Sequence, residues 1–239
     1  MFFRFCFRFR KTVCFMVQFL SPTVESTVLS VFAHPDDAEL SCFGLLAKLR
    51  ESGWKIVMAI ATRGENGADS QAWNRESEAR ASAALIGAEV VFGDFRDGSV
   101  PRSSDLIGWV DSLLETWRPA LIVTHFAGEA RLAHQDHVAV EAAVHIATRR
   151  AAWLPDLLLA EGVDAEPSFR PNWFADVTAQ FDCKLRALAT HESQAGKPYM
   201  RADFTRLRAR RWELQFPSND MSETAPRYWE AFVSARHVI

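Results

Sequence analysis

Two short segments hold most of the side chains that could carry out chemistry. The first, AHPDDAE, contains His34, Asp36 and Asp37. The second, HQDH, contains His134 and His137. Histidine and aspartate are common zinc ligands, and three protein ligands with one open position are typical of a catalytic rather than a structural zinc site. Taken together, the two segments predict a single metal site to which both contribute.

Each segment by itself has a simpler interpretation. A Pro-Asp-Asp sequence usually forms a turn and caps the helix that follows it. A His-x-Asp-His sequence at the start of a helix usually provides a cap and faces the solvent. Both simpler interpretations lose weight because each segment follows a predicted strand, at the edge of the sheet where this fold class binds its ligands.

Short apolar runs alternate with longer helical patterns from Thr27 onward. The first four apolar runs predict buried strands, at 27–33, 55–62, 89–92 and 119–125. The patterns that follow them predict helices, at 39–53, 75–87, 103–117 and 137–150. The later part is less regular, with strands predicted at 157–162 and 173–178 and helices at 179–191 and 200–214. The alternation predicts the α/β class, with a doubly wound, mostly parallel sheet, helices on both faces and a single domain.

Polar side chains follow each of the first four predicted strands. Ligands of doubly wound sheets bind beyond the carboxyl ends of the strands, so these side chains are expected to gather at one edge. In chain order they are His34, Asp36, Asp37 and Glu39, then Arg63, Glu65 and Asn66, then Asp94 and Asp97, and finally His125, His134, Asp136 and His137.

Several well-known catalytic motifs are absent from the sequence. His191 and Glu192 are not followed by a second histidine at the H-E-x-x-H spacing. The sequence also has no G-x-S-x-G, no Walker A loop and no G-x-G-x-x-G. An enzyme that transfers hydride or hydrolyses nucleotides would therefore have a suitable sheet but no phosphate-binding loop.

Composition narrows the class of protein. The chain has 239 residues, of which 49% are hydrophobic and 24% charged, and its formal net charge is −3. These values exclude a disordered, collagen-like or coiled-coil chain and predict no nucleic-acid partner. No stretch approaches the roughly 20 apolar residues that cross a bilayer, so no stable membrane insertion is expected. The four cysteines form no C-x-x-C pair, which favours free thiols and a cytoplasmic location.

Residues 1–26 differ in composition from the rest of the chain and are expected to lie outside the fold, which then spans 27–239. Seven of the 18 phenylalanines fall within the first 19 residues, interleaved with arginine. Three interpretations stay open: a start codon upstream of the natural one, a signal peptide, or a tether to a membrane surface. Export or membrane-surface association through this segment is the minor alternative to a cytoplasmic location.

The two motifs, in this order, resemble the PIG-L/LmbE-like family of zinc-dependent N-acetylglucosaminyl deacetylases. AHPDDAE is similar to the family's opening motif and HQDH to its second motif. Further stretches have family counterparts in the same order, namely TRGENG, NRESEA, LIGAEV, the VTH run, KLRALATHESQ and YWEAF. The resemblance covers residues 27–232. It implies a Rossmann-like fold, in agreement with the pattern of strands and helices.

The resemblance also implies roles for individual residues. His34, Asp37 and His137 correspond to the family's zinc ligands, and Asp36 corresponds to its general base. Zn2+ is the expected cofactor, although the same ligand set could hold Fe2+, manganese or cobalt.

The remaining correspondences concern substrate and proton transfer. His134 matches the residue that stabilises the oxyanion or protonates the leaving amine, with Asp136 expected beside it as an orienting carboxylate. Arg75 matches an arginine associated with substrate binding, and the role of His191 is left open. The loop FAGEARLA before HQDH departs from the family's pattern and is expected to shape the choice of substrate.

The implied function is a metal-dependent hydrolase that removes an N-acetyl group from a GlcNAc-type amino-sugar conjugate through zinc-activated water. Its partner is thus a small N-acetylated molecule, and a homo-oligomer is left open. One alternative is an amidase that cleaves a larger acyl group, such as that of a thiol-sugar conjugate. Another is a non-catalytic metal- or sugar-binding protein. The presence of Asp36 and His134 argues against the second alternative, because binding alone requires neither.

Overall fold

A seven-stranded sheet organises the part of the chain that the computed structural model describes, which is residues 26–67, 72–128, 133–163, 167–216 and 225–236. The strands are β1 (Thr27–Phe32), β2 (Lys55–Thr62), β3 (Glu89–Phe95), β4 (Leu121–His125), β5 (Asp156–Ala160), β6 (Trp173–Asp176) and β7 (Trp229–Arg236). Their order across the sheet is β3-β2-β1-β4-β5-β7-β6. Strands β1 to β5 run parallel, and β7 runs antiparallel to both β5 and β6. The predicted α/β class with a mostly parallel sheet is confirmed.

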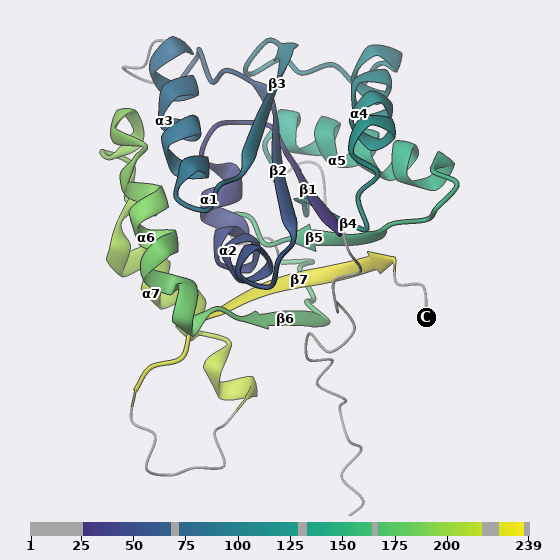
Figure 1. The fold of residues 1–239 in the computed structure, drawn as a ribbon. Helices are drawn as coiled ribbons and strands as arrows, with labels where there is room; N and C mark the ends of the chain where they lie inside the picture. The colour runs from purple at the N-terminus through teal and green to yellow at the C-terminus, as the bar shows by residue number, and fades with distance from the viewer. Residues whose placement is uncertain (1–25, 68–71, 129–132, 164–166, 217–224, 237–239) are drawn as a thin grey trace, which may run out of the picture.

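Helices cover both faces of this sheet (Figure 1). In the described residues they are α1 (Asp37–Ser41), α2 (Phe43–Glu51), α3 (Ala72–Ala84), α4 (Ser104–Trp117), α5 (Gln135–Arg150), α6 (Phe181–Ala189) and α7 (Ala202–Arg210). Helices α1, α2, α3 and α6 lie on one side of the sheet, and α4 and α5 lie on the other. Short 3-10 turns follow α6, at Glu192–Gln194 and Pro198–Met200.

The central strand β1 contributes to two separate cores. Val28 and Phe32 pack in the cluster that includes residues of α2 and α6, whereas Leu29 and Val31 pack in the cluster that includes residues of α4 and α5. A parallel strand covered by helices on both faces is apolar along most of its length. This explains why residues 27–33 are mostly apolar rather than alternating, with the buried Ser30 hydroxyl donating to the carbonyl oxygen of Val57.

Several predicted boundaries differ by a few residues from the observed ones, as for the helix predicted at 75–87 and observed at Ala72–Ala84. Two of the differences need a closer description. The helix expected at 39–53 is two helices, because Cys42 has φ −142° and ψ 10°, outside the helical region, and separates α1 from α2. Strand β3 continues to Phe95 instead of ending at residue 92. Both differences bear on the candidate site, since α1 begins at Asp37 and the loop after β3 carries Asp97.

Strand β7 was not predicted from the sequence, although it lies between β5 and β6. Its buried face includes Glu230, which is only 5% exposed and interrupts the apolar pattern expected of a core strand. The carboxylate of Glu230 accepts hydrogen bonds from the backbone N–H groups of Gly44 and Leu45, at 2.9 and 2.7 Å. It also accepts one from the Lys184 ammonium group, at 2.6 Å. The buried carboxylate thereby accepts hydrogen bonds from two N–H groups of the first turn of α2, which have no partner within the helix.

The Lys184–Glu230 pair supplies a first testable prediction. Both side chains are about one-twentieth exposed, so replacing Lys184 with methionine leaves a buried charge that retains only its backbone donors. We expect the free energy of unfolding to fall by about 3 kcal/mol, the lower end for breaking a buried ion pair. Chemical unfolding of the two proteins measures the difference.

The matched control is Lys55→Met, which breaks an exposed ion pair with Glu89. An exposed pair contributes at most about 1 kcal/mol. Equal losses of stability in the two variants would contradict the structural role given to Lys184.

No helix among the described residues has the length and apolar character required to cross a membrane. Residues 1–25 and His237 lie outside the described residues. The interpretation of the N-terminal segment and the boundary of the domain at residue 27 therefore stay predictions.

Candidate metal centre and catalytic cavity

The two segments singled out in the sequence meet where the strand order of the sheet reverses. AHPDDAE follows β1, HQDH opens α5 after β4, and β1 and β4 are hydrogen-bonded neighbours. Strands β2 and β3 extend the sheet from β1 in one direction, and β5 extends it from β4 in the other. Such a switch point leaves a crevice at the carboxyl edge in which α/β proteins bind ligands. The fold thereby brings together His34 and His137, which lie 103 positions apart.

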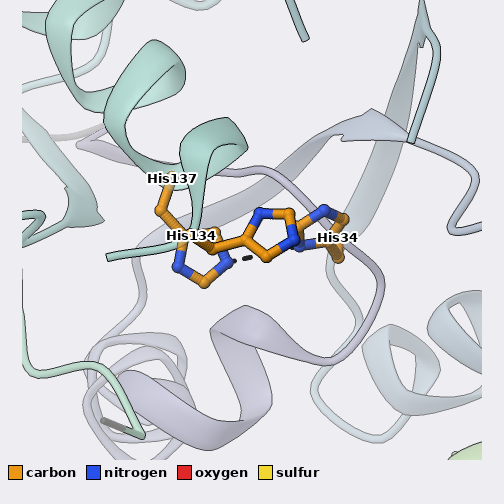
Figure 2. Close-up of side chains that lie close together, drawn as sticks. All are labelled: His34, His134 and His137. Carbon is orange, nitrogen blue, oxygen red and sulfur yellow. Dashed lines mark hydrogen bonds between the residues drawn. The ribbon is translucent and has the colours of Figure 1, made fainter. Parts of the chain in front are cut away.

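Three side chains at this edge place their ligand atoms close together. His137 Nε2 lies 3.3 Å from His34 Nδ1 and 3.4 Å from an oxygen of Asp37, and His34 Nδ1 lies 3.3 Å from the other Asp37 oxygen. Ligand atoms around a tetrahedral zinc ion with bonds of about 2.0–2.1 Å are separated by about 3.3–3.4 Å. Each pair of these residues thus offers donor atoms at a separation that suits one tetrahedral ion, with the two histidines near different oxygens of Asp37. The same residues also belong to two groups whose ligand atoms all lie within 4.8 Å of one another, His34 with His134 and His137, and Asp37 with His125 and His137. Figure 2 shows that the His134 ring lies beside the rings of His34 and His137.

Two carboxylates contact the other nitrogen of the His34 ring. His34 Nε2 lies 3.1 Å from Asp136 Oδ2 and 3.1 Å from Asp97 Oδ1. The Asp136 carboxylate is itself fixed by the backbone N–H groups of Gly98 and Val100, at 2.7 and 3.0 Å. Carboxylates in this position orient a metal-binding imidazole and make it more basic. The pKa of His34 accordingly lies well above its ordinary value, because Asp136, Asp37 and Asp97 outweigh the opposing effect of burial.

The contact of Asp136 differs from the one expected. The sequence placed its carboxylate beside His134, but the carboxylate binds His34, and only the backbone N–H of Asp136 reaches His134 Nδ1, at 3.3 Å. The reason lies in the loop after β3, whose backbone donors draw the carboxylate away from His134. Partial burial lowers the pKa of His134, and the charges of the nearby His34 and His137 rings lower it further. A neutral ring that accepts at Nδ1 carries its proton on Nε2.

Asp36 lies beside the three candidate ligands in an unusual backbone conformation. Its φ of 110° is in the left-handed region, which side chains with a Cβ rarely adopt. The residue is 5% exposed, and burial raises the pKa of its carboxyl to about 7, against the opposing effect of the Arg75 guanidinium. A carboxyl group with a pKa near the operating pH is suited to accept and return a proton.

The predicted substrate-binding residue Arg75 is 4% exposed. Its guanidinium donates to the carbonyl oxygens of Pro35 and Gly64, at 2.6 and 3.1 Å, and to Asp36 Oδ2, at 3.2 Å. Arg75 thus joins α3 to the segment that follows β1, and it also lines the cavity in front of the site.

Sequence reasoning gave His125 no role, yet its ring packs directly against the candidate ligands. It stacks on His137 with ring centroids 4.0 Å apart and an angle of 10° between the planes. Its Nε2 accepts the backbone N–H of Ala33 at 2.9 Å. Burial and the neighbouring His137 hold the pKa of His125 well below its ordinary value. Its place at the carboxyl end of β4, in the VTH run, was the signal available in the sequence.

A cavity of about 490 Å³ opens in front of the site. The candidate ligands and Asp36 line one side of it, together with Asn66 and Asp97. Gln194, Lys197 and Tyr199 line it from the 3-10 turns after α6. Gln194 ends the KLRALATHESQ stretch, but no sequence motif pointed to Lys197 or Tyr199, because only the tertiary fold carries the segment after α6 to the sheet edge.

His191, whose role was left open, lies in a buried polar group away from the cavity lining. Its Nε2 is 3.3 Å from Glu39 Oε1, which also accepts the hydroxyl of Ser82 at 2.6 Å. Burial lowers the pKa of His191, but the charge of Glu39 and its contact with the ring together raise the pKa above its ordinary value. His191 therefore ties the segment after α6 to α1 and α3.

Comparison with known proteins places this chain in a family. The model of the family PIG-L, described as GlcNAc-PI de-N-acetylase, matches residues 29–148, which contain both motifs. The chain is 30% identical over 171 residues to the Escherichia coli (strain K12) protein called uncharacterized deacetylase YaiS, covering 70% of this chain and 90% of that protein. It is 27% identical to the diacetylchitobiose deacetylase of Thermococcus kodakarensis, covering 70% of this chain and 69% of the other.

Solved structures share the fold as well. GalB of Pseudomonas putida KT2440, a 4-carboxy-2-hydroxymuconate hydratase, superposes with a TM-score of 0.75 at 21% identity, covering 90% of this chain and 98% of GalB. Proteins of this fold thus have hydratase as well as deacetylase names, so the reaction must be argued from the site. The matched motifs and the relatives together show that the chain belongs to the PIG-L family.

Proposed function

We propose that this protein is a metal-dependent hydrolase that removes an N-acetyl group from a small GlcNAc-type amino-sugar conjugate. The observation that carries the proposal is that the donor atoms of His34, Asp37 and His137 approach one another in pairs to 3.3–3.4 Å, beside a buried carboxyl group and open to a cavity. The deacetylase relatives, one named for diacetylchitobiose, support the same class of substrate.

In this proposal His34, Asp37 and His137 hold the metal ion, with zinc as the expected ion and Fe2+ as the alternative. When bound, the ion acts as a Lewis acid that acidifies water and polarises the amide carbonyl. The carboxylates around His34 support the assignment, because surroundings that raise the pKa of an imidazole also favour a metal cation in contact with it.

Asp36 is the proposed general base. It takes a proton from the attacking water and, once protonated, is an acid of suitable strength to pass that proton to the departing amine. Its burial supports this double use, since it raises the pKa to about 7.

His134 is the proposed donor to the developing oxyanion. Its Nδ1 accepts a backbone N–H, which leaves the Nε2–H to donate toward the cavity that the residue lines. A neutral imidazole can stabilise an oxyanion as a fixed hydrogen-bond donor. The lowered pKa of His134 favours this role over the protonated form that would be needed to protonate the amine. Asp136 acts in the proposal through His34 rather than through His134.

The experiment measures acetate release by the full-length, zinc-loaded protein from diacetylchitobiose, N-acetylglucosamine and its nucleotide-linked and lipid-linked conjugates. We expect acetate from at least one compound and none after the metal is removed with a chelator. If no compound released acetate although the protein held one zinc ion per chain, the deacetylase proposal would be rejected.

Two other activities are tested in parallel because the family and its fold permit them. An amidase would release a larger acyl group from a thiol-sugar conjugate. A hydratase would add water to a carbon–carbon double bond of an unsaturated compound, the activity suggested by the name of the relative called 4-oxalmesaconate hydratase, which is 22% identical to this chain. Turnover of either compound without acetate release would assign the site to that reaction instead.

A further inference from the structure

Asp36 adopts a conformation that its own residue type disfavours, so neighbouring groups must hold it. Its φ of 110° lies in the left-handed region, and its side chain makes no hydrogen bond that caps α1. Residues with a Cβ are sterically disfavoured in this region and stay there only when their surroundings enforce it.

The Arg75 guanidinium supplies this restraint from the neighbouring helix α3. One nitrogen, Nη2, donates both to the carbonyl oxygen of Pro35 and to the Asp36 carboxylate, at 2.6 and 3.2 Å. The other, Nη1, donates to the carbonyl oxygen of Gly64, at 3.1 Å. The planar group is therefore held at both ends, and it fixes the backbone before Asp36 and the side chain of Asp36 at once.

Gly64 provides the space that this arrangement needs. A Cβ at this position would lie 2.3 Å from Arg75 Nη1 and 2.6 Å from Arg75 Cζ, closer than non-bonded atoms approach. The guanidinium thus lies where any other residue would place its side chain. The glycine of the TRGENG segment and the arginine of NRESEA therefore depend on each other, because the guanidinium occupies the space that the missing side chain leaves free.

We propose that Arg75 is a positioning residue that acts through Asp36, and that Gly64 makes room for it. The inference rests on the proposed function, in which Asp36 accepts the proton of the attacking water. It replaces the substrate-binding role expected for Arg75. Proton transfer requires the carboxylate within hydrogen-bond reach of its proton, and a displacement of about 1 Å can lower a rate by about 100-fold.

The test is the variant Gly64→Ala, which displaces the guanidinium without removing any charged group. We expect kcat to fall by about 10- to 100-fold, with KM and zinc affinity unchanged. Arg75→Lys, which keeps the charge but loses the two-ended geometry, should reproduce the effect if Gly64→Ala folds poorly.

Two matched controls separate this effect from general strain. Gly53→Ala also places a Cβ at a positive φ, 90°, but meets nothing within 4 Å. Arg80→Lys changes an exposed arginine on the same helix, paired with Glu76. Both should keep the kcat of the parent protein.

A double-mutant cycle distinguishes positioning from substrate contact. If Arg75 acts through Asp36, Gly64→Ala should change the residual kcat of Asp36→Asn by less than about twofold. A tenfold loss in both backgrounds, or a rise in KM alone, would overturn the proposal and return Arg75 to substrate binding.

A crystal structure of zinc-loaded Gly64→Ala gives a readout that does not depend on activity. We expect the Asp36 carboxylate displaced while His34, Asp37 and His137 stay in place. An unmoved Asp36 would overturn the positioning role even if the protein released no acetate, whereas a displaced Asp36 in a protein whose parent releases no acetate would refute only the proposed function.

Discussion

Asp36→Asn is expected to keep the metal ion bound and to lower kcat by about 10²- to 10⁴-fold, the usual contribution of a general base. Asparagine has nearly the same shape, and its amide oxygen can still accept from Arg75, so the surroundings of the site should persist. What it lacks is a lone pair basic enough to take a proton from water. Acetate release by the zinc-loaded variant, with zinc content measured in the same sample, checks both halves of the expectation.

The matched control is Asp94→Asn, which changes a 96% exposed carboxylate near the end of strand β3. Its kcat should equal that of the parent protein. The acid limb of the pH profile supplies a second check, because a base works only when ionised and activity must fall as the pH drops through its pKa. An unchanged kcat in Asp36→Asn would remove Asp36 from the mechanism.

His137→Ala is expected to abolish acetate release and to weaken zinc binding by more than about 100-fold. Loss of a residue that merely orients a ligand already weakens a metal site by about 10- to 100-fold, and loss of a ligand removes a bond outright. The substitution leaves His34 and Asp37 as a two-residue site, which is short of the three ligands of catalytic zinc. Competition with a chromophoric chelator measures the affinity.

His145→Ala is the control for this variant. His145 lies on the same helix α5, is about two-fifths exposed and is paired only loosely with Glu141, at 3.8 Å. Zinc affinity and activity should both be retained. Full zinc occupancy in His137→Ala at the parent's affinity would refute the ligand assignment.

The first half of the fold could be predicted because its signals are local. Strands β1, β2 and β4 are continuous apolar runs bounded by polar loops, and each following helix shows its own periodicity. The candidate ligands were found for the same reason, since each motif is a few residues long and directly follows a strand.

What could not be predicted depends on contacts between distant segments. The preference of the Asp136 carboxylate for His34 is decided by the backbone donors of Gly98 and Val100, which no spacing in the sequence reveals. The burial of Arg75 likewise depends on a glycine in another loop. Strand β7 was missed because its buried Glu230 looks like a solvent-facing residue until Lys184 and the start of α2 are placed beside it.

The late position of β7 in the chain has a consequence for synthesis on the ribosome. Translation at about 5–20 residues per second separates Lys184 from Glu230, 46 positions later, by about 2–9 s. During that interval the edge of β5 has no partner strand, and unpaired edges are the sites at which nascent chains associate wrongly. All three candidate metal ligands emerge before that interval begins. Synthesis of the candidate ligands and completion of the sheet are therefore separate events in time, and a nascent chain stalled after α6 would offer these ligands on an unfinished fold.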